Sequence, residues 1–150
     1  MIEAPLVAFE KIASAKIAYA WNENDHGQIG RIYRQSSLYL FLLCGWLFLL
    51  VNANVDALFT FLPEGYSQTK WVVLIISSGT LYNMATGLNA PILFNSDRYR
   101  YGAVFLVLLA VIVLALQYFL IPLYGLEGAA SATALASFIY NTMLMLTVWK

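Results

Sequence analysis

The residues best placed to do chemistry are amide and hydroxyl side chains set inside an apolar stretch, residues 71–93. Asn83 and Thr86 share one face of the expected helix, and Asn89 is offset from Asn83 by about 120 degrees. An unpaired amide in hydrocarbon is costly, so each must find a partner or water. Together with a similar amide at Asn141, the cluster predicts a hydrated cavity for a polar substrate. For each residue taken singly, a hydrogen bond to a neighbouring helix is the alternative.

Residue patterns typical of enzymes are missing from the sequence. It contains no Gly-x-x-x-x-Gly-Lys-Ser/Thr phosphate loop, and its single histidine and single cysteine are His26 and Cys44. One histidine and one cysteine cannot assemble the usual metal or nucleophile sites. We therefore predict no catalytic residues, no metal site, no cofactor and no enzymatic activity. The net charge of zero gives no indication of a nucleic-acid partner.

Apolar stretches long enough to cross a bilayer make up most of the chain. Hydrophobic residues form 61% of the sequence and charged residues 11%, against roughly 25% charged residues in soluble domains. A helix needs about 20 residues to cross the hydrocarbon core of a membrane. The sequence therefore predicts an all-α, polytopic transmembrane helix bundle (residues 37–150), with spans at residues 37–62, 71–93, 102–123 and 127–149.

The segments before the first span have a different pattern. In residues 1–21, apolar residues recur at spacings of three and four, which describes one helical stripe: Ile2, Leu6, Phe9, Ala13, Ile17 and Ala20. This segment is either an interfacial amphipathic helix or the tail of a truncated transmembrane helix. Residues 22–36 begin with Asn, Asp and Gly and predict a cytoplasmic loop that leads into the first span.

Three polar residues lie near the end of the first predicted span: Asn52, Asn54 and Asp56. A carboxylate at a helix C-terminus is disfavoured by the negative end of the helix dipole. We therefore predict a helix break near Asn52 and Asn54. Asp56 would then be the N-cap of a short helix, residues 57–62, before a turn at residues 63–65.

The last two predicted spans differ in their expected surroundings. Residues 102–123 are almost purely aliphatic, with only Gln117 as an interruption, and are expected to face lipid over much of their surface. The span over 127–149 carries small residues four apart, at Gly128, Ala132 and Ala136. Such a ridge lets another helix approach closely, so these residues are predicted to serve packing.

Basic residues lie mainly on one side of the predicted spans. Leaving aside Lys11 and Lys16, Lys70 is on one side and the other five are on the opposite side: Arg31, Arg34, Arg98, Arg100 and Lys150. Cytoplasmic segments of membrane proteins are enriched in lysine and arginine. Both termini and the connection over residues 95–101 are therefore predicted to be cytoplasmic.

Short phrases along the chain follow a familiar order: Ile32-Tyr33-Arg34-Gln35-Ser36-Ser37, Leu62-Pro63-Glu64-Gly65-Tyr66, Thr86-Gly87-Leu88-Asn89, Asn95-Ser96-Asp97-Arg98-Tyr99-Arg100 and Leu120-Ile121-Pro122-Leu123-Tyr124-Gly125-Leu126-Glu127-Gly128-Ala129-Ala130. Read together, they resemble the C-terminal half of bacterial polysaccharide flippases of the multidrug/oligosaccharidyl-lipid/polysaccharide exporter superfamily. The last phrase, a turn between two spans, is the most specific.

The resemblance implies the C-lobe of a flippase that moves lipid-linked oligosaccharide across the bacterial inner membrane by alternating access. The implied partners are the lipid-linked oligosaccharide, membrane lipids and the N-terminal helix bundle of the family, which this sequence does not contain. In that family, basic residues of the central cavity bind the pyrophosphate of the substrate. No arginine or lysine lies in the four predicted spans, so the resemblance assigns that role to regions outside this sequence.

Two other functions stay open at this point. One is a self-contained four-span transporter of drugs or ions that acts as a dimer, but such proteins use a carboxylate deep in an early span. Asp56 is expected near a membrane face instead. The other is a non-transporting membrane scaffold, for which the small-residue face around Ala132 would drive association.

Overall fold

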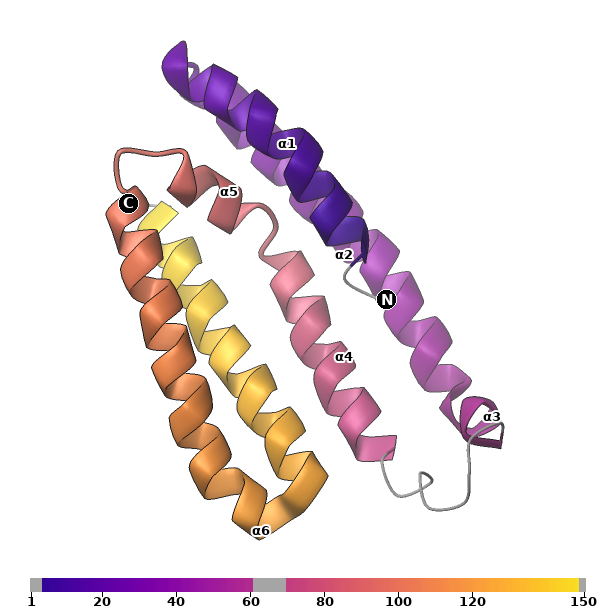
Figure 1. The fold of residues 1–150 in the computed structure, drawn as a ribbon. Helices are drawn as coiled ribbons and strands as arrows, with labels where there is room; N and C mark the ends of the chain where they lie inside the picture. Colours follow the sequence, from indigo (N-terminus) through magenta and orange to yellow (C-terminus); the bar gives the residue numbers. More distant parts are fainter. Residues whose placement is uncertain (1–3, 61–69, 149–150) are drawn as a thin grey trace.

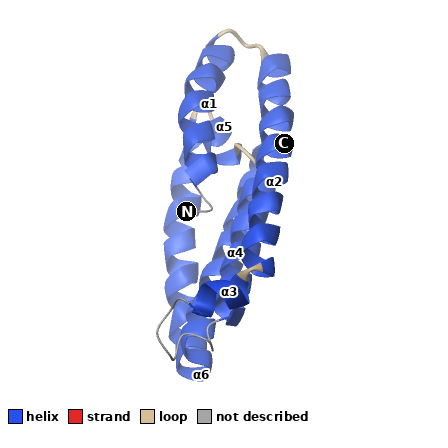
Figure 2. Cartoon of the chain, turned by 90° about the vertical axis from the view of Figure 1, so that its right-hand side faces the viewer, coloured by secondary structure: helices blue, strands red, loops and turns tan. Residues whose placement is uncertain are grey.

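The computed structural model describes residues 4–60 and 70–148 of the chain, and within these ranges it contains helices and no strand (Figures 1 and 2). The all-α prediction is confirmed. The helices in chain order are α1 (Ala4–Asn22), α2 (His26–Ala53), α3 (Val55–Thr60), α4 (Lys70–Ala85), α5 (Asn89–Phe94) and α6 (Tyr99–Val148). The predicted turn at residues 63–65 and the last residues of the first and fourth predicted spans lie outside the described ranges.

Helix α1 packs against α2 and α5 through one apolar stripe. Four residues of the predicted stripe are buried: Leu6, Ala13, Ile17 and Ala20. Phe9 of the same set is 36% exposed. The amide of Asn95, after α5, also donates to the hydroxyl of Ser14 on α1 at 3.3 Å. α1 is thus attached to the rest of the chain by burial of apolar surface and by this hydrogen bond.

Helix α2 begins much earlier than the sequence pattern indicated. The carboxylate of Asp25 accepts a hydrogen bond from the backbone N–H of Gln28 at 2.9 Å and so caps a helix that starts at His26. Ile29 then packs with Ile17 and Ala20 of α1 in one apolar cluster. Most of the loop predicted over residues 22–36 is therefore helix, because the cap and the contact with α1 stabilise the first turns.

The helix is interrupted at Asn54, between α2 and α3. The backbone N–H of Asn54 and its side-chain amide both donate to the carbonyl of Leu50, at 3.3 and 2.8 Å, which terminates α2. Asp56 lies in the first turn of α3 and not at its N-cap, because α3 already begins at Val55. There the carboxylate meets the positive end of the α3 dipole and forms an ion pair with Lys70.

The predicted span over residues 71–93 is two helices instead of one. α4 ends at Ala85, and α5 begins at Asn89 and runs at an angle to it (Figure 1). Gly87 between them has a φ of 70°, a left-handed conformation that ends helices and that glycine adopts without strain. The hydroxyl of Thr86 donates to the carbonyl of Asn83 at 2.7 Å and so satisfies one acceptor at the end of α4.

Helix α6 is a hairpin of two helical arms. Its 50 residues include Gly125 with φ 57° and ψ −127°, where the chain reverses, and Figure 1 shows the two arms side by side. Gly128 lies so close to the backbone of Leu120 that a Cβ there would be 2.6 Å from the Leu120 carbonyl carbon. The second arm packs against α4, whose Gly79 lies close to Ala134: a Cβ built on Gly79 would be 3.1 Å from the Ala134 Cβ.

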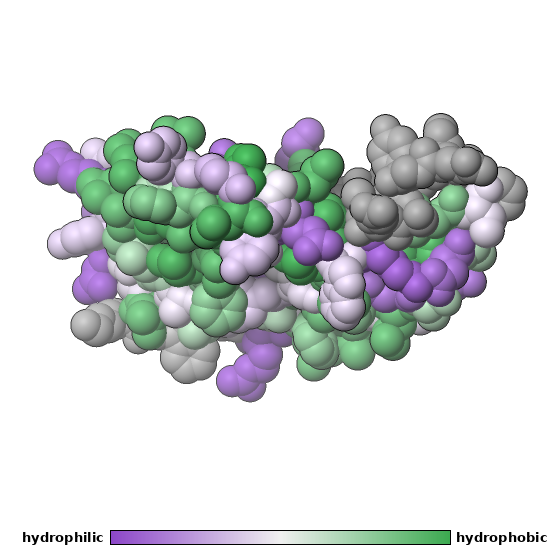
Figure 3. All heavy atoms as spheres, turned by 90° about the horizontal axis from the view of Figure 1, so that it is seen from below, coloured by the Kyte–Doolittle hydropathy of each residue, from purple (hydrophilic) through white to green (hydrophobic). Residues whose placement is uncertain are grey.

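Two helices of the described chain are long and apolar enough to cross a membrane, α2 and the α6 hairpin. The prediction of four separate spans is not confirmed: α4 ends at Ala85 after 16 residues, before the Gly87 break. The α1–α2 turn, α5 and the end of α6 lie at one end of the bundle, and α3 and the α6 turn lie at the other (Figure 1). Seen from that second end, apolar residues cover much of the surface, with hydrophilic residues among them (Figure 3).

Candidate functional site

The break between α4 and α5 carries two buried polar side chains without hydrogen-bond partners. Asn89 is 1% exposed, and neither atom of its amide has a partner within the described part of the chain. The Ser37 hydroxyl of α2 is also buried and has no hydrogen-bond partner among the described residues. Ser37 packs directly on Gly87, because a Cβ built on Gly87 would overlap the Ser37 Oγ. Two unpaired polar groups therefore lie at one helix break.

Of the other predicted cavity residues, Thr86 is buried at the same break, and its hydroxyl is bonded to the Asn83 carbonyl. Asn83 and Asn141 lie elsewhere. Asn83 lines a small cavity of about 80 Å³ between α4 and α6, beside Thr80 and Ser137. Asn141 is buried, and its amide donates to the carbonyl of Ser137 in its own helix at 2.9 Å. The structure thus separates Asn83 and Asn141 from Asn89, although the sequence pattern predicted that all three line one cavity. The reason is the break at Gly87, which changes the direction of the chain between Asn83 and Asn89.

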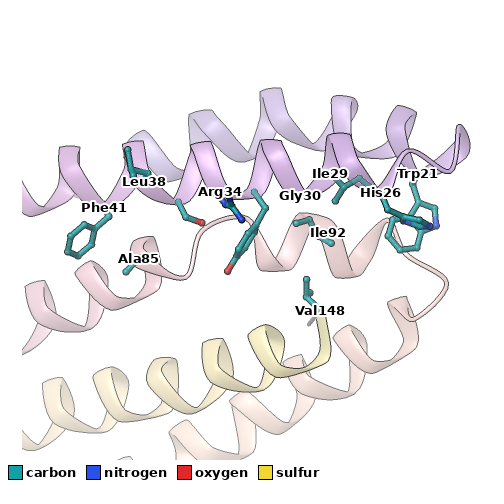
Figure 4. Close-up of a pocket in the computed structure, with 12 residues that line it drawn as sticks. Trp21, His26, Ile29, Gly30, Arg34, Leu38, Phe41, Ala85, Ile92 and Val148 are labelled. Atoms are coloured by element: carbon teal, nitrogen blue, oxygen red, sulfur yellow. The ribbon is translucent and has the colours of Figure 1, made fainter. Parts of the chain in front are cut away.

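A larger groove of about 730 Å³ lies between α2, the α4–α5 break and the last turn of α6 (Figure 4). Its polar lining comes from α2 and the end of α1: Trp21, His26, Tyr33, Arg34 and Ser37. Its apolar lining includes Leu38, Phe41, Ile92 and Val148. Ser37 belongs both to this groove and to the contact with Gly87, so the groove reaches the helix break.

Arg34 is a candidate site residue that the sequence pattern did not indicate. It was assigned to a loop, whereas the structure places it in α2 with its side chain at the groove. Among the described residues it has no acidic partner within ion-pair distance. A helical period was present in the sequence before residue 37, since Gly30, Arg34, Leu38 and Phe41 recur at spacings of three and four.

A side-chain hydrogen bond connects the last turns of α2 to the middle of α4, away from the break at Gly87. The amide of Asn52 donates to the Ser77 hydroxyl at 3.1 Å and to the Phe48 carbonyl of its own helix at 2.8 Å. Ser77 is 2% exposed and donates in turn to the Val73 carbonyl at 2.6 Å. Further along, the hydroxyls of Tyr82 and Thr142 join α4 to α6 at 2.8 Å.

The Asn52–Ser77 bond gives a prediction about stability. In a double-mutant cycle of Asn52→Ala and Ser77→Ala, we expect a coupling of about 0.6 kcal/mol in the free energy of unfolding in detergent, as measured for such pairs between membrane helices. Asn54→Ala is the matched control, because its amide bonds only to Leu50 in its own helix. If the coupling energy of Asn52→Ala with Ser77→Ala is no larger than that of Asn54→Ala with Ser77→Ala, the hydrogen bond between Asn52 and Ser77 is contradicted.

The remaining predicted residues are either paired at the surface or packed inside the chain. Asp56 is 79% exposed in its ion pair with Lys70. Gly128, Ala132 and Ala136 are buried within the chain itself, so the small-residue ridge already packs internally. Within residues 4–60 and 70–148, no group of three or more His, Cys, Asp or Glu side chains could hold a metal ion.

Comparison with the models of known protein families, with curated proteins and with solved structures found no match to this chain. Its function therefore has to be argued from the break, the groove and the sequence resemblance.

Proposed function

We propose that this chain is the C-lobe of a bacterial inner-membrane flippase that moves lipid-linked oligosaccharide or polysaccharide precursors by alternating access. The N-terminal bundle of such a flippase would be its partner in forming the transport path. The proposal has three parts: a membrane location, a transport path at the α4–α5 break, and a family resemblance. Each part has its own support.

The membrane location is supported by where the apolar side chains lie. Only 17% of the most apolar window of α2, and none of that of α6, is buried by the rest of the chain. A core helix of a water-soluble protein would bury this surface, so lipid is its natural solvent. We propose four crossings: α2, α4 together with α5, and the two arms of α6. In this arrangement α4 and α5 together form one membrane crossing, because α4 alone is short.

The orientation follows from the arginines. Arg31, Arg34, Arg98 and Arg100 lie on segments at the end of the bundle that holds the α1–α2 turn, and Lys70 begins α4 at the opposite end (Figure 1). The arginine-rich end is therefore proposed as the cytoplasmic one, with the end of α6 on that side. α1 begins beside the middle of α2, where Leu6 packs with Leu40 and Cys44 (Figure 1).

The observation that carries the transport proposal is the broken crossing with its unpaired polar groups. In hydrocarbon, irregular backbone is tolerated only where it is covered by protein or lines a water-filled cavity. Discontinuous helices of this kind form the substrate and ion sites of many transporters. Ser37 lines the groove, and the buried, unpartnered amide of Asn89 lies one helical turn before Ile92, which also lines it. Both polar groups are therefore candidates to interact with a polar substrate at this break.

The resemblance gains support from the same contact. Two of the phrases that carry it, residues 32–37 and residues 86–89, are about fifty residues apart in the sequence. They meet where Ser37 packs on Gly87. A third phrase, residues 120–130, forms the turn of α6, with Gly125 at the reversal and Gly128 against Leu120.

The alternatives lack comparable support. A small drug exporter needs a carboxylate deep in the membrane, and Asp56 is largely exposed and paired with Lys70. A scaffold that associates through its small-residue ridge needs that ridge on the surface, and Ala132 and Ala136 are fully buried.

Asn89→Leu tests the transport proposal. Leucine has the same number and branching of side-chain heavy atoms but no polar ones, so the variant removes two unsatisfied buried groups and is expected to be more stable by about 1 kcal/mol. If Asn89 serves transport, the bacterium that expresses this variant loses most of its surface polysaccharide although the protein is more stable. Surface polysaccharide is measured by immunoblot of whole cells and protein abundance in isolated membranes.

Asn54→Leu is the control, because the Asn54 amide is at a helix end and far from the groove along α2. It is expected to keep normal surface polysaccharide. Normal polysaccharide in the Asn89→Leu strain, at equal protein abundance, would refute the transport role of the break.

A further inference from the structure

The groove beside α2 has a polar mouth and an apolar interior. Arg34 lies about two helical turns along α2 from His26, at the end where the helix meets α1, and Leu38 and Phe41 follow toward the middle of the helix (Figure 4). Leu38 and Phe41 are 55% and 49% exposed. Beyond Ser37 the lining along α2 is apolar, whereas the cationic and hydrogen-bonding side chains lie toward the α1–α2 turn, among Ile29, Ile92 and Val148.

The charge of the groove is positive. Arg34 is its one arginine, and no aspartate or glutamate is among its lining residues in the described part of the chain. A guanidinium without an acidic neighbour presents two parallel N–H donors, which match the geometry of a phosphate group. The rings of Trp21 and His26 meet edge to face at 5.5 Å at the mouth, where aromatic side chains commonly lie at headgroup depth.

We propose that this groove binds an anionic glycerophospholipid of the cytoplasmic leaflet, with the headgroup phosphate on Arg34 and an acyl chain along Leu38 and Phe41. Basic pockets between transmembrane helices on the cytoplasmic side are the usual sites for such lipids. An acyl chain in this position would cover apolar surface that the chain itself leaves exposed. The inference depends on the membrane location and cytoplasmic orientation proposed above, but not on flippase activity.

The test is lipid retention by the purified full chain, measured by native mass spectrometry in detergent. Phosphatidylglycerol is expected to be retained about tenfold more strongly than phosphatidylcholine, because both lipids carry the phosphate but the choline ammonium offsets its negative charge beside Arg34. Arg34→Gln should remove this preference, and Arg34→Lys should keep part of it because the charge remains. Arg31→Gln is the matched control, since Arg31 is exposed on the same helix one turn away and does not line the groove.

Three results would overturn the proposal. One is an equal loss of retention in the Arg34→Gln and Arg31→Gln variants at unchanged thermal stability, which would indicate general surface charge. Another is competition by soluble glycerol 3-phosphate as strong as that by phosphatidylglycerol, which would indicate a site for free phosphate. The third is preferential retention of a polyprenyl phosphate, which would make the groove part of the substrate path. Loss of polysaccharide export in Asn89→Leu bears on the proposed function alone.

Discussion

Gly128→Ala is expected to lower the free energy of unfolding by about 3 kcal/mol, because the added methyl group would overlap a backbone carbonyl. A Cβ at the ideal position would overlap the Leu120 carbonyl oxygen and would be 2.6 Å from the carbonyl carbon. Backbone atoms cannot rotate away as a side chain can. The two arms of α6 would have to separate at the turn, and the packing of the second arm on α4 would be weakened with it.

The measurement is unfolding of the purified chain in detergent, followed by circular dichroism. Gly45→Ala is the control, because Gly45 is inside α2 with open space where its Cβ would lie. Alanine is the better helix former, so that variant is expected to be unchanged or more stable by about 0.5 kcal/mol. Equal stabilities of the Gly128 and Gly45 variants would show that the α6 turn is not as closely packed as described.

Gly87→Ala is expected to have the second-largest effect, also a loss of about 3 kcal/mol, from two separate causes. The left-handed φ of 70° costs about 1 kcal/mol for a residue with a Cβ. The rest comes from Ser37, whose Oγ would overlap the new methyl group and whose Cβ would be 3.0 Å from it. Since this contact joins α2 to the helix break, the proposed flippase function also predicts a loss of polysaccharide export.

The double variant Gly87→Ala, Ser37→Gly separates the two causes. Removing the serine side chain relieves the clash but leaves the backbone strain, so about 1 kcal/mol of destabilisation relative to Ser37→Gly alone should remain. The free energy of unfolding in detergent is again the measurement. No recovery in the double variant would mean that Ser37 does not pack on Gly87.

Local patterns in the sequence were enough to predict the helical class, the apolar stripe of α1 and the termination of the first long helix close to Asn54. Helical periodicity and apolar length depend on residues within a few positions of one another. The stripe residues Leu6, Ala13, Ile17 and Ala20 are buried for this reason. Asn54 ends α2 with hydrogen bonds to a residue only four positions away.

The candidate site was predictable only in part. Asn89 and Asn83 were singled out because amides are rare in apolar stretches, but their grouping assumed one continuous helix through Gly87. Arg34 was assigned to a loop because Asn, Asp and Gly precede it, although Asp25 caps α2 and Ile29 packs on α1. The Asp25 cap is itself a local signal in the sequence, whereas the contacts of Ile29 with α1 and of Ser37 with Gly87 join segments that are apart in the chain.

By itself, then, the sequence determined that this chain is helical, that its apolar surface exceeds what 150 residues can bury, and where its polar residues interrupt that surface. Only the tertiary structure decided which of these polar and small residues contact one another. Ser37 reaches Gly87, Arg34 lines a groove that α5 and the end of α6 complete, and Gly128 lies on Leu120. The physical reason is that packing between segments far apart in the chain depends on how whole helices approach, and residue spacing carries no information about that approach.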